Sequence, residues 1–122
     1  MTSTSVLFVS HDADLSAAAS RVLTSAGCQV RVAAHAGHAT LACLAGRFDV
    51  LIVDRHMADG SSEAVAERFR RQCPQGNIVW VGDSTTAGLT GDLEVARPFD
   101  AYDLIGAVSD ATHYARRLAT SR

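Results

Sequence analysis

Cysteine is scarce in this sequence, and its pattern excludes a disulfide-rich or zinc-binding domain. Among 122 residues there are three cysteines, an odd number, and Cys28, Cys43 and Cys73 show none of the paired spacings of a zinc site. Their neighbours are apolar or belong to segments with a helical pattern. We therefore expect free thiols and a reducing, cytoplasmic location.

Long apolar runs and an excess of positive charge are also missing. The N-terminal MTSTSVLFVS has no basic residue and an apolar run of only Val6 to Val9, so it is neither a signal peptide nor a membrane span. The formal charge of -2 gives no electrostatic reason to expect nucleic acid or an anionic membrane as a partner. No Gly-x-Gly-x-x-Gly turn or P-loop follows this run, which argues against a nucleotide-binding domain.

Short apolar runs that alternate with amphipathic segments are the main feature present. A chain of 122 residues with 48% hydrophobic residues is long enough for one domain with one core. Five runs predict strands: Val6 to Val9, Val30 to Ala34, Val50 to Val53, Ile78 to Val81 and Leu93 to Ala96. Three of them are unbroken apolar quartets, typical of strands covered on both faces in a parallel sheet. The two mixed runs, 30–34 and 93–96, are expected at the edges.

The segments between these strands have the period of helices. Helices are predicted over residues 12–26, 37–45, 62–73 and the stretch after Asp100. Asp12 or Asp14 is the expected N-cap of the first helix, and Gly27 its C-terminal stop. The interval 83–92, DSTTAGLTGD, breaks the alternation and predicts a loop or at most one turn. Strands alternating with helices imply a doubly wound α/β fold.

Polar residues follow the strands where an open α/β sheet carries its functional groups. These strand-end residues are Ser10, His11 and Asp12 after the first strand, Asp54 after the third, Gly82 after the fourth, and Arg97 and Pro98 after the fifth. An isolated aspartate at such a place would simply cap loop amides. Asp54, however, is followed by MADG, and an RPF motif stands after the fifth strand.

Three stretches, VLFVSHDADL, FDVLIVDRHMADGSS and ARPFD, resemble the receiver domain of two-component response regulators, and the resemblance covers nearly all of the chain. In that family the aspartate ending the third strand accepts a phosphoryl group, so Asp54 corresponds to the phospho-acceptor. Arg97 and Pro98 correspond to the family's Lys-Pro. The resemblance implies a flavodoxin-like, five-stranded parallel sheet of order 2-1-3-4-5, with a shortened or missing fourth helix, and a single receiver-like domain over 1–122 without an output domain.

The sequence departs from the family at the positions that carry the phosphotransfer chemistry. The family's two adjacent carboxylates, which hold Mg²⁺, are replaced by Ser10 and His11, with Asp12 one place later. Gly82 replaces a hydroxyl residue that contacts the phosphoryl group, and Glu94 replaces an aromatic switch residue. Whether a hydroxyl from Ser84, Thr85 or Thr86 takes over the missing contact is left open.

Loss of the acidic pair is expected to abolish or weaken metal binding. Mg²⁺ prefers oxygen ligands in octahedral geometry, and an imidazole is a poor substitute. We therefore expect no cofactor; a retained magnesium site would use Asp54, Asp12 and the backbone of His56. With His11 and Arg97 facing it, Asp54 is expected in a constant ion pair rather than among repelling carboxylates.

These observations predict a non-enzymatic signalling domain. The leading hypothesis is an atypical receiver with little or no phosphorylation, whose surface near the fifth strand and last helix contacts a protein partner, a histidine kinase or an output protein. The alternative is a conventional phospho-acceptor receiver, in which Asp54 serves a phosphorelay and Arg97 replaces the lysine. A third class, a small hydrolase or metal enzyme, would use His11 with His56 or Asp54, or a metal shared by His35 and His38.

Overall fold

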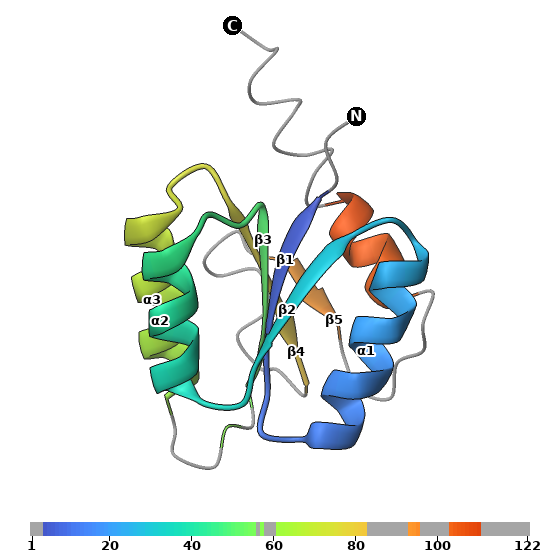
Figure 1. Ribbon diagram of the computed structural model, residues 1–122, viewed down its shortest axis with the longest axis horizontal. Coiled ribbons are helices and arrows are strands. Elements are labelled where there is room, and N and C mark those ends of the chain that lie inside the picture. The colour runs from blue at the N-terminus through green and yellow to red at the C-terminus, as the bar shows by residue number, and fades with distance from the viewer. Residues whose placement is uncertain (1–3, 56, 58–60, 83–92, 96–102, 111–122) are drawn as a thin grey trace, which may run out of the picture.

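Short connections between strands and helices build an open α/β sheet (Figure 1). The computed structural model describes residues 4–55, 57, 61–82, 93–95 and 103–110; for 93–95 only the backbone is described. The predicted loop at 83–92, the residues Arg97, Pro98 and Asp100, and the chain beyond 110 lie outside these ranges. The expectation of a shortened or missing fourth helix therefore stays a prediction.

Five parallel strands form the sheet. They are β1 (Ser5–Val9), β2 (Gln29–Ala33), β3 (Val50–Asp54), β4 (Asn77–Val81) and β5 (Leu93–Val95). Their order is β2-β1-β3-β4-β5, which confirms the predicted order, with the two mixed runs at the edges. The three apolar quartets are β1, β3 and β4, and their residues are buried because helices cover both faces.

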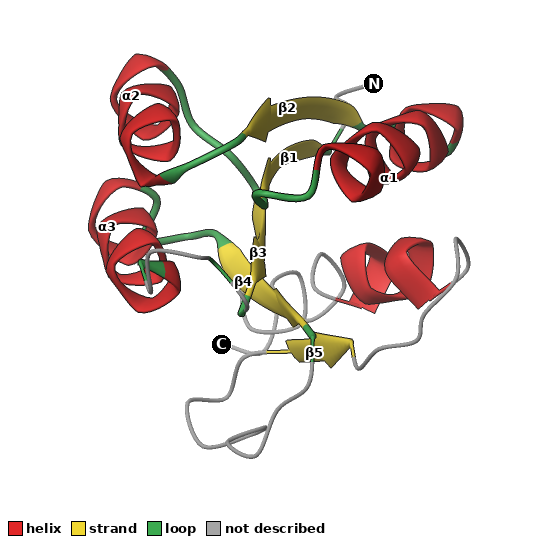
Figure 2. Ribbon diagram, turned by 90° about the horizontal axis from the view of Figure 1, so that it is seen from below, coloured by secondary structure: helices red, strands yellow, loops and turns green. Residues whose placement is uncertain are grey.

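Helices cover the sheet in two pairs (Figure 2). On one face α2 (Ala36–Ala45) and α3 (Ser62–Gln72) lie side by side, and on the other α1 (Ala13–Ser25) lies beside a helical segment at 103–110. Each face has its own apolar core: Phe69 and Trp80 belong to the first, Phe8 and Leu23 to the second. Val65 and Phe69 on α3, Cys73 at its C-cap, and Leu104 and Val108 in the segment 103–110 are all buried.

The ends of α1 follow from two residues that the sequence singled out. Asp12 is the N-cap, and its carboxylate accepts a hydrogen bond from the Leu15 amide at 3.0 Å. Gly27, one residue beyond the C-cap, has φ 93, a conformation that glycine adopts without strain. Both predictions are confirmed, and together they fix the direction in which the chain enters and leaves α1.

The inward face of α2 is made of small side chains. Ala39, Ala42 and Cys43 are buried against the sheet and α3, whereas Leu41 and Leu44 are 65% and 61% exposed. Small residues let the helix approach its neighbours closely, so the two leucines are left on the solvent side. Helical period alone identified this helix, but the size of its residues decided which face is buried.

Gly76, in the turn between α3 and β4, allows a close approach that a side chain would prevent. A Cβ at this position would lie 2.6 Å from Cζ of Phe69, a ring that is fully buried, and 3.1 Å from the Phe48 carbonyl oxygen. We expect Gly76→Ala to lower the free energy of unfolding by about 1–2 kcal/mol through overpacking.

Urea denaturation measures this effect, with Gly46→Ala as the matched control. A Cβ at Gly46 meets nothing within 4 Å and its backbone is extended, so this variant should be neutral or slightly stabilising. Equal losses in the two variants would mean that contact with Phe69 is not the cause.

Candidate functional site

Asp54 ends β3 as a buried carboxylate with a hydroxyl partner. Only 4% of Asp54 is exposed, and Ser10, 1% exposed, donates a hydrogen bond from Oγ to Asp54 Oδ2 at 2.8 Å. The parallel register of β1 with β3 explains this contact, because Val9 pairs with Val53 and the next residue of each strand projects to the same side. A neutral donor therefore lies against the predicted phospho-acceptor.

Ser10 is itself held in place by the turn into α1. The Asp12 amide donates to Ser10 Oγ at 3.1 Å, so the hydroxyl accepts from the backbone while it donates to Asp54. The Asp12 carboxylate accepts from the Leu15 amide as the N-cap of α1. This capping role gives Asp12 a structural function at the position where the sequence offered it as a magnesium ligand.

The backbone around Asp54 is fixed on its other side by α3 and β4. The buried Ser62 hydroxyl, at the start of α3, donates to the carbonyl oxygen of Asp54 at 2.6 Å and to that of Arg55 at 3.3 Å. The Arg55 amide donates to the Val81 carbonyl at 2.9 Å. The Arg55 guanidinium lies 4.4 Å from the ring centroid of Trp80, a cation–π contact. These contacts hold the end of β3 rigidly beside Ser10.

The structure places only some of the other predicted site residues. His11 follows Ser10 with an exposed side chain, and Glu94 pairs in register with Trp80 through the backbone of β5. His56, Arg97 and Pro98 lie outside the described residues, as do Ser84, Thr85 and Thr86. The constant ion pair of Asp54 with His11 and Arg97 therefore stays a prediction.

The backbone conformation at Gly82, directly after β4, favours glycine over the hydroxyl residue of the family. The residue is buried and has φ 125, in the range that residues with a Cβ rarely adopt. Serine or threonine in the same backbone conformation would be strained, more so for the β-branched threonine. The missing hydroxyl at this position is thus tied to the course of the backbone.

The described residues contain no group of three or more His, Cys, Asp or Glu side chains that could hold a metal ion. His35 is the N-cap of α2, and its Nδ1 accepts a hydrogen bond from the His38 amide at 3.3 Å, with the two rings 3.9 Å apart. His35 therefore has a structural role at the start of α2, and the metal-sharing role considered for the pair stays a hypothesis.

All three cysteines are free thiols, as the sequence predicted. Burial raises the pKa of the Cys28 thiol. Burial, and to a smaller extent the neighbouring Cys73, raise the pKa of the Cys43 thiol, and Arg68 opposes the shift. Neutral, protonated thiols are poor nucleophiles, so neither Cys28 nor Cys43 is an activated cysteine.

The architecture matches solved structures over almost its whole length. A response regulator receiver protein from Sinorhizobium medicae superposes with a TM-score of 0.82 at 22% identity, over 93% of this chain and 97% of that one. A CheY-like receiver domain protein from Methanospirillum hungatei gives a TM-score of 0.84 at 16% identity, over 95% of this chain and 98% of that one. The chain has the fold of a response-regulator receiver domain.

Part of a larger protein is also similar to this receiver fold. NtrX from Brucella abortus gives a TM-score of 0.83 at 18% identity, and the match covers 99% of this chain but 30% of that one. No protein-family model and no curated protein matches the sequence. None of the helices in the described ranges has the length and apolar character needed to cross a membrane.

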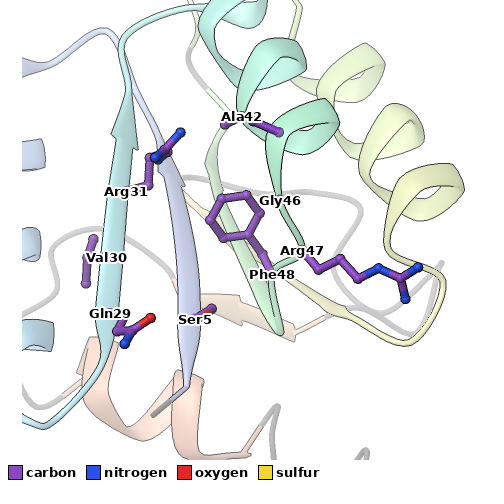
Figure 3. Close-up of a pocket in the computed structure, with 9 residues that line it drawn as sticks. Ser5, Gln29, Val30, Arg31, Ala42, Gly46, Arg47 and Phe48 are labelled. Atoms are coloured by element: carbon purple, nitrogen blue, oxygen red, sulfur yellow. The ribbon is translucent and has the colours of Figure 1, made fainter. Parts of the chain in front are cut away.

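A pocket of about 320 Å³ lies at the other end of the receiver fold (Figure 3). It opens between the amino ends of β1 and β2, represented by Ser5 and Gln29, and the segment that leaves α2. The Phe48 ring lies between the strands and α2, whereas Arg47 points away from the strands. Since Asp54 is at the carboxyl end of β3, this pocket is separate from the predicted acceptor.

Proposed function

We propose that this chain is an atypical receiver domain, which signals through contact with a protein partner and takes up little or no phosphate at Asp54. The receiver fold alone does not establish this role, because one fold hosts many functions. The observation that carries the proposal is the buried hydrogen bond from Ser10 Oγ to Asp54 Oδ2. It lies where the family resemblance places a carboxylate that holds Mg²⁺.

The donor set around Asp54 argues against a magnesium site. Mg²⁺ needs near-octahedral oxygen ligands and binds through carboxylates. Beside Asp54 the chain offers the neutral hydroxyl of Ser10, and the carboxylate nearest to Ser10 in sequence, that of Asp12, caps α1. In the described ranges no third acidic, His or Cys side chain joins them as a ligand group.

Without the metal, phosphoryl transfer to Asp54 loses its main electrostatic support. The transferring group carries negative charge on its equatorial oxygens, and a bound cation stabilises it by several kcal/mol. Ser10 also occupies a lone pair of Asp54 Oδ2, which makes this oxygen a weaker nucleophile. We therefore propose a constant state of the Asp54 site, in which the Ser10 hydroxyl holds the carboxylate without a phosphate or a metal ion.

A domain of this kind has a binding role and no enzymatic one. We propose that it works in the cytoplasm, where its free thiols remain reduced. Its partner would be a histidine kinase or an output protein that contacts the surface near β5 and the helical segment at 103–110. Neither nucleic acid nor a membrane is needed for this role, in keeping with the formal charge of -2.

A conventional phospho-acceptor receiver is the second candidate. Asp54 supports it, because a buried carboxylate at the carboxyl end of the central strand β3 occupies the acceptor position of the family. In that case Arg97 would bind the phosphoryl oxygens in place of the lysine, and Mg²⁺ would be the cofactor.

Intact mass after incubation with acetyl phosphate, with and without Mg²⁺ or Mn²⁺, separates the two candidates. For the wild type we expect no phosphate adduct under either condition. The double variant Ser10→Asp/His11→Asp, which restores the acidic pair, should form a metal-dependent adduct that Asp54→Asn abolishes in the same background. A metal-dependent adduct on the wild type, lost in Asp54→Asn, would overturn the proposal in favour of the conventional receiver.

The hydrolase or metal-enzyme alternative needs a separate check. Elemental analysis of the purified protein should find no stoichiometric transition metal, because neither His35 nor the Asp54 site gathers a complete ligand set among the described residues. A stoichiometric metal that His11→Ala removes would support the metal-enzyme class instead.

A further inference from the structure

A groove runs between α1 and the carboxyl end of β2, next to the Asp54 site. Its volume is about 480 Å³, which is within the range of small-molecule sites. The residues that line it come from both elements and from the turn that contains Ser10: Ser10, His11, Ala13, Ser16, Ala17, Ser20, Arg21, Thr24, Val32 and Ala34. On α1 they form one flank of the helix.

Ser16, at the inner margin of this flank, carries an unsatisfied hydroxyl. The side chain is 5% exposed, and its Oγ has no hydrogen-bond partner among the described residues. Buried polar atoms are nearly always paired, and leaving a hydroxyl without a partner is costly. Because Ser16 lines the groove, a rotation of its side chain toward a ligand that presents a hydrogen-bond acceptor, such as a carbonyl oxygen, would satisfy it.

Arg21 and Val32 supply a positive charge and an apolar surface with which a ligand in the groove can interact. Arg21, at the outer margin of the same flank, is exposed, and its guanidinium has no ion-pair partner in the described part of the chain. Val32, on the edge strand β2, is 42% exposed, an unusually open position for a large apolar residue of the sheet. The groove thus combines an apolar wall with a hydroxyl donor and a guanidinium that have no partner among the residues described.

We infer that this groove binds small linear molecules that have a carbonyl acceptor at one end, an apolar chain, and a carboxylate at the other. Ser16 and Arg21 are five residues apart on α1, which corresponds to about 7.5 Å along the helix axis and about 140° around it. The long Arg21 side chain must therefore turn back over the groove to meet a ligand there. An acylated amino acid with a chain of several methylene groups spans this distance. Its carbonyl would accept from Ser16, its chain would pack on Val32 and Ala17, and its carboxylate would pair with Arg21.

Binding at this groove is independent of whether Asp54 is phosphorylated, so it can be tested without the function proposed above. The probe is ε-acetamidocaproate, which carries both end groups on one chain, added to isotope-labelled full-length protein. In the amide NMR spectrum we expect saturable shifts of Ser16, Ala17, Arg21 and Val32, with affinity in about the millimolar range for a ligand of this size. Caproate, which lacks the amide, and N-hexylacetamide, which lacks the carboxylate, should each bind about tenfold more weakly.

Matched variants locate the site. Ala17→Leu fills the groove and should weaken binding at least about tenfold, a difference of about 1.4 kcal/mol. Ala18→Leu makes the same change one residue along, at an exposed position outside the groove, and should leave binding unchanged. Arg21→Gln should reduce the affinity for ε-acetamidocaproate but leave that for N-hexylacetamide unaltered.

Ser16→Ala supplies a second measurement. If the hydroxyl has no partner in the free protein, the urea midpoint of this variant should be unchanged or raised, because alanine also favours the helix. A lowered midpoint would show an internal partner for Ser16 and overturn the inference. Shifts that do not saturate, or equal losses of binding in Ala17→Leu and Ala18→Leu, would overturn it as well.

Discussion

Replacing Ser10 with alanine is expected to lower the free energy of unfolding by about 2–3 kcal/mol, the loss typical of removing a buried hydrogen bond to a charged group. The hydroxyl donates to Asp54 Oδ2 at 2.8 Å and accepts from the Asp12 amide at 3.1 Å. The alanine variant leaves the buried Asp54 carboxylate without this donor and the Asp12 amide without its acceptor. Urea denaturation followed by circular dichroism measures the loss.

Ser16→Ala is the matched control for Ser10→Ala. Both serines are buried, but Ser16 Oγ has no partner among the described residues, so the same substitution should cost nothing there. A double-mutant cycle between Ser10→Ala and Asp54→Ala should give a coupling energy of about 1–3 kcal/mol. A coupling energy near zero would mean that the hydrogen bond does not stabilise the fold, and the main support for a constant Asp54 site would be lost.

Restoring the acidic pair with Ser10→Asp/His11→Asp is expected to make stability depend on Mg²⁺. Two carboxylates about 4 Å apart repel by roughly 4 kcal/mol at an effective dielectric constant near 20, so the variant without metal should be less stable than the wild type by about this amount. At a Mg²⁺ concentration about 100 times the dissociation constant, binding would return about 2.7 kcal/mol. The melting temperature of the wild type should not respond to Mg²⁺.

Ser10→Asn/His11→Asn is the matched neutral variant, because asparagine has the size of aspartate without its charge. Thermal unfolding of all three proteins at several Mg²⁺ concentrations, at constant ionic strength, gives the comparison. Only the acidic variant should gain stability from the metal. An equal rise of the wild-type melting temperature would reveal a magnesium site beside Asp54 that uses groups other than an acidic pair.

The elements of the fold were predictable because their sequence signals are local. Apolar quartets marked the central strands, Asp12 and Gly27 marked the ends of α1, and the mixed composition of the edge strands gave their place in the sheet. In each case burial or capping acts on residues close together in the chain. The position of Asp54 at the end of β3 followed from the same signals.

The partner of Asp54 was not predictable in the same way. Because side chains alternate along a strand, Ser10 and His11 are expected to point to opposite sides. The sequence does not give the register of β1 against β3, which places Ser10 beside Asp54. The hydrogen bond from the neutral hydroxyl of Ser10 to the carboxylate was therefore not predicted. The ion pair of Asp54 with His11 and Arg97 stays a prediction. The groove beside α1 was not predictable for a related reason, since its residues come from α1 and β2, which are separated in sequence.

Gly82 limits which of the family's phosphotransfer residues can be restored by substitution alone. The acidic pair can be rebuilt by changing two side chains on an unaltered backbone. A side-chain hydroxyl after β4 cannot be introduced in this way. At φ 125 a residue with a Cβ is strained, so serine or threonine would need a different backbone conformation at this position. Restoring a hydroxyl at residue 82 therefore requires a change of backbone conformation, whereas restoring the acidic pair at Ser10 and His11 requires only a change of side chains.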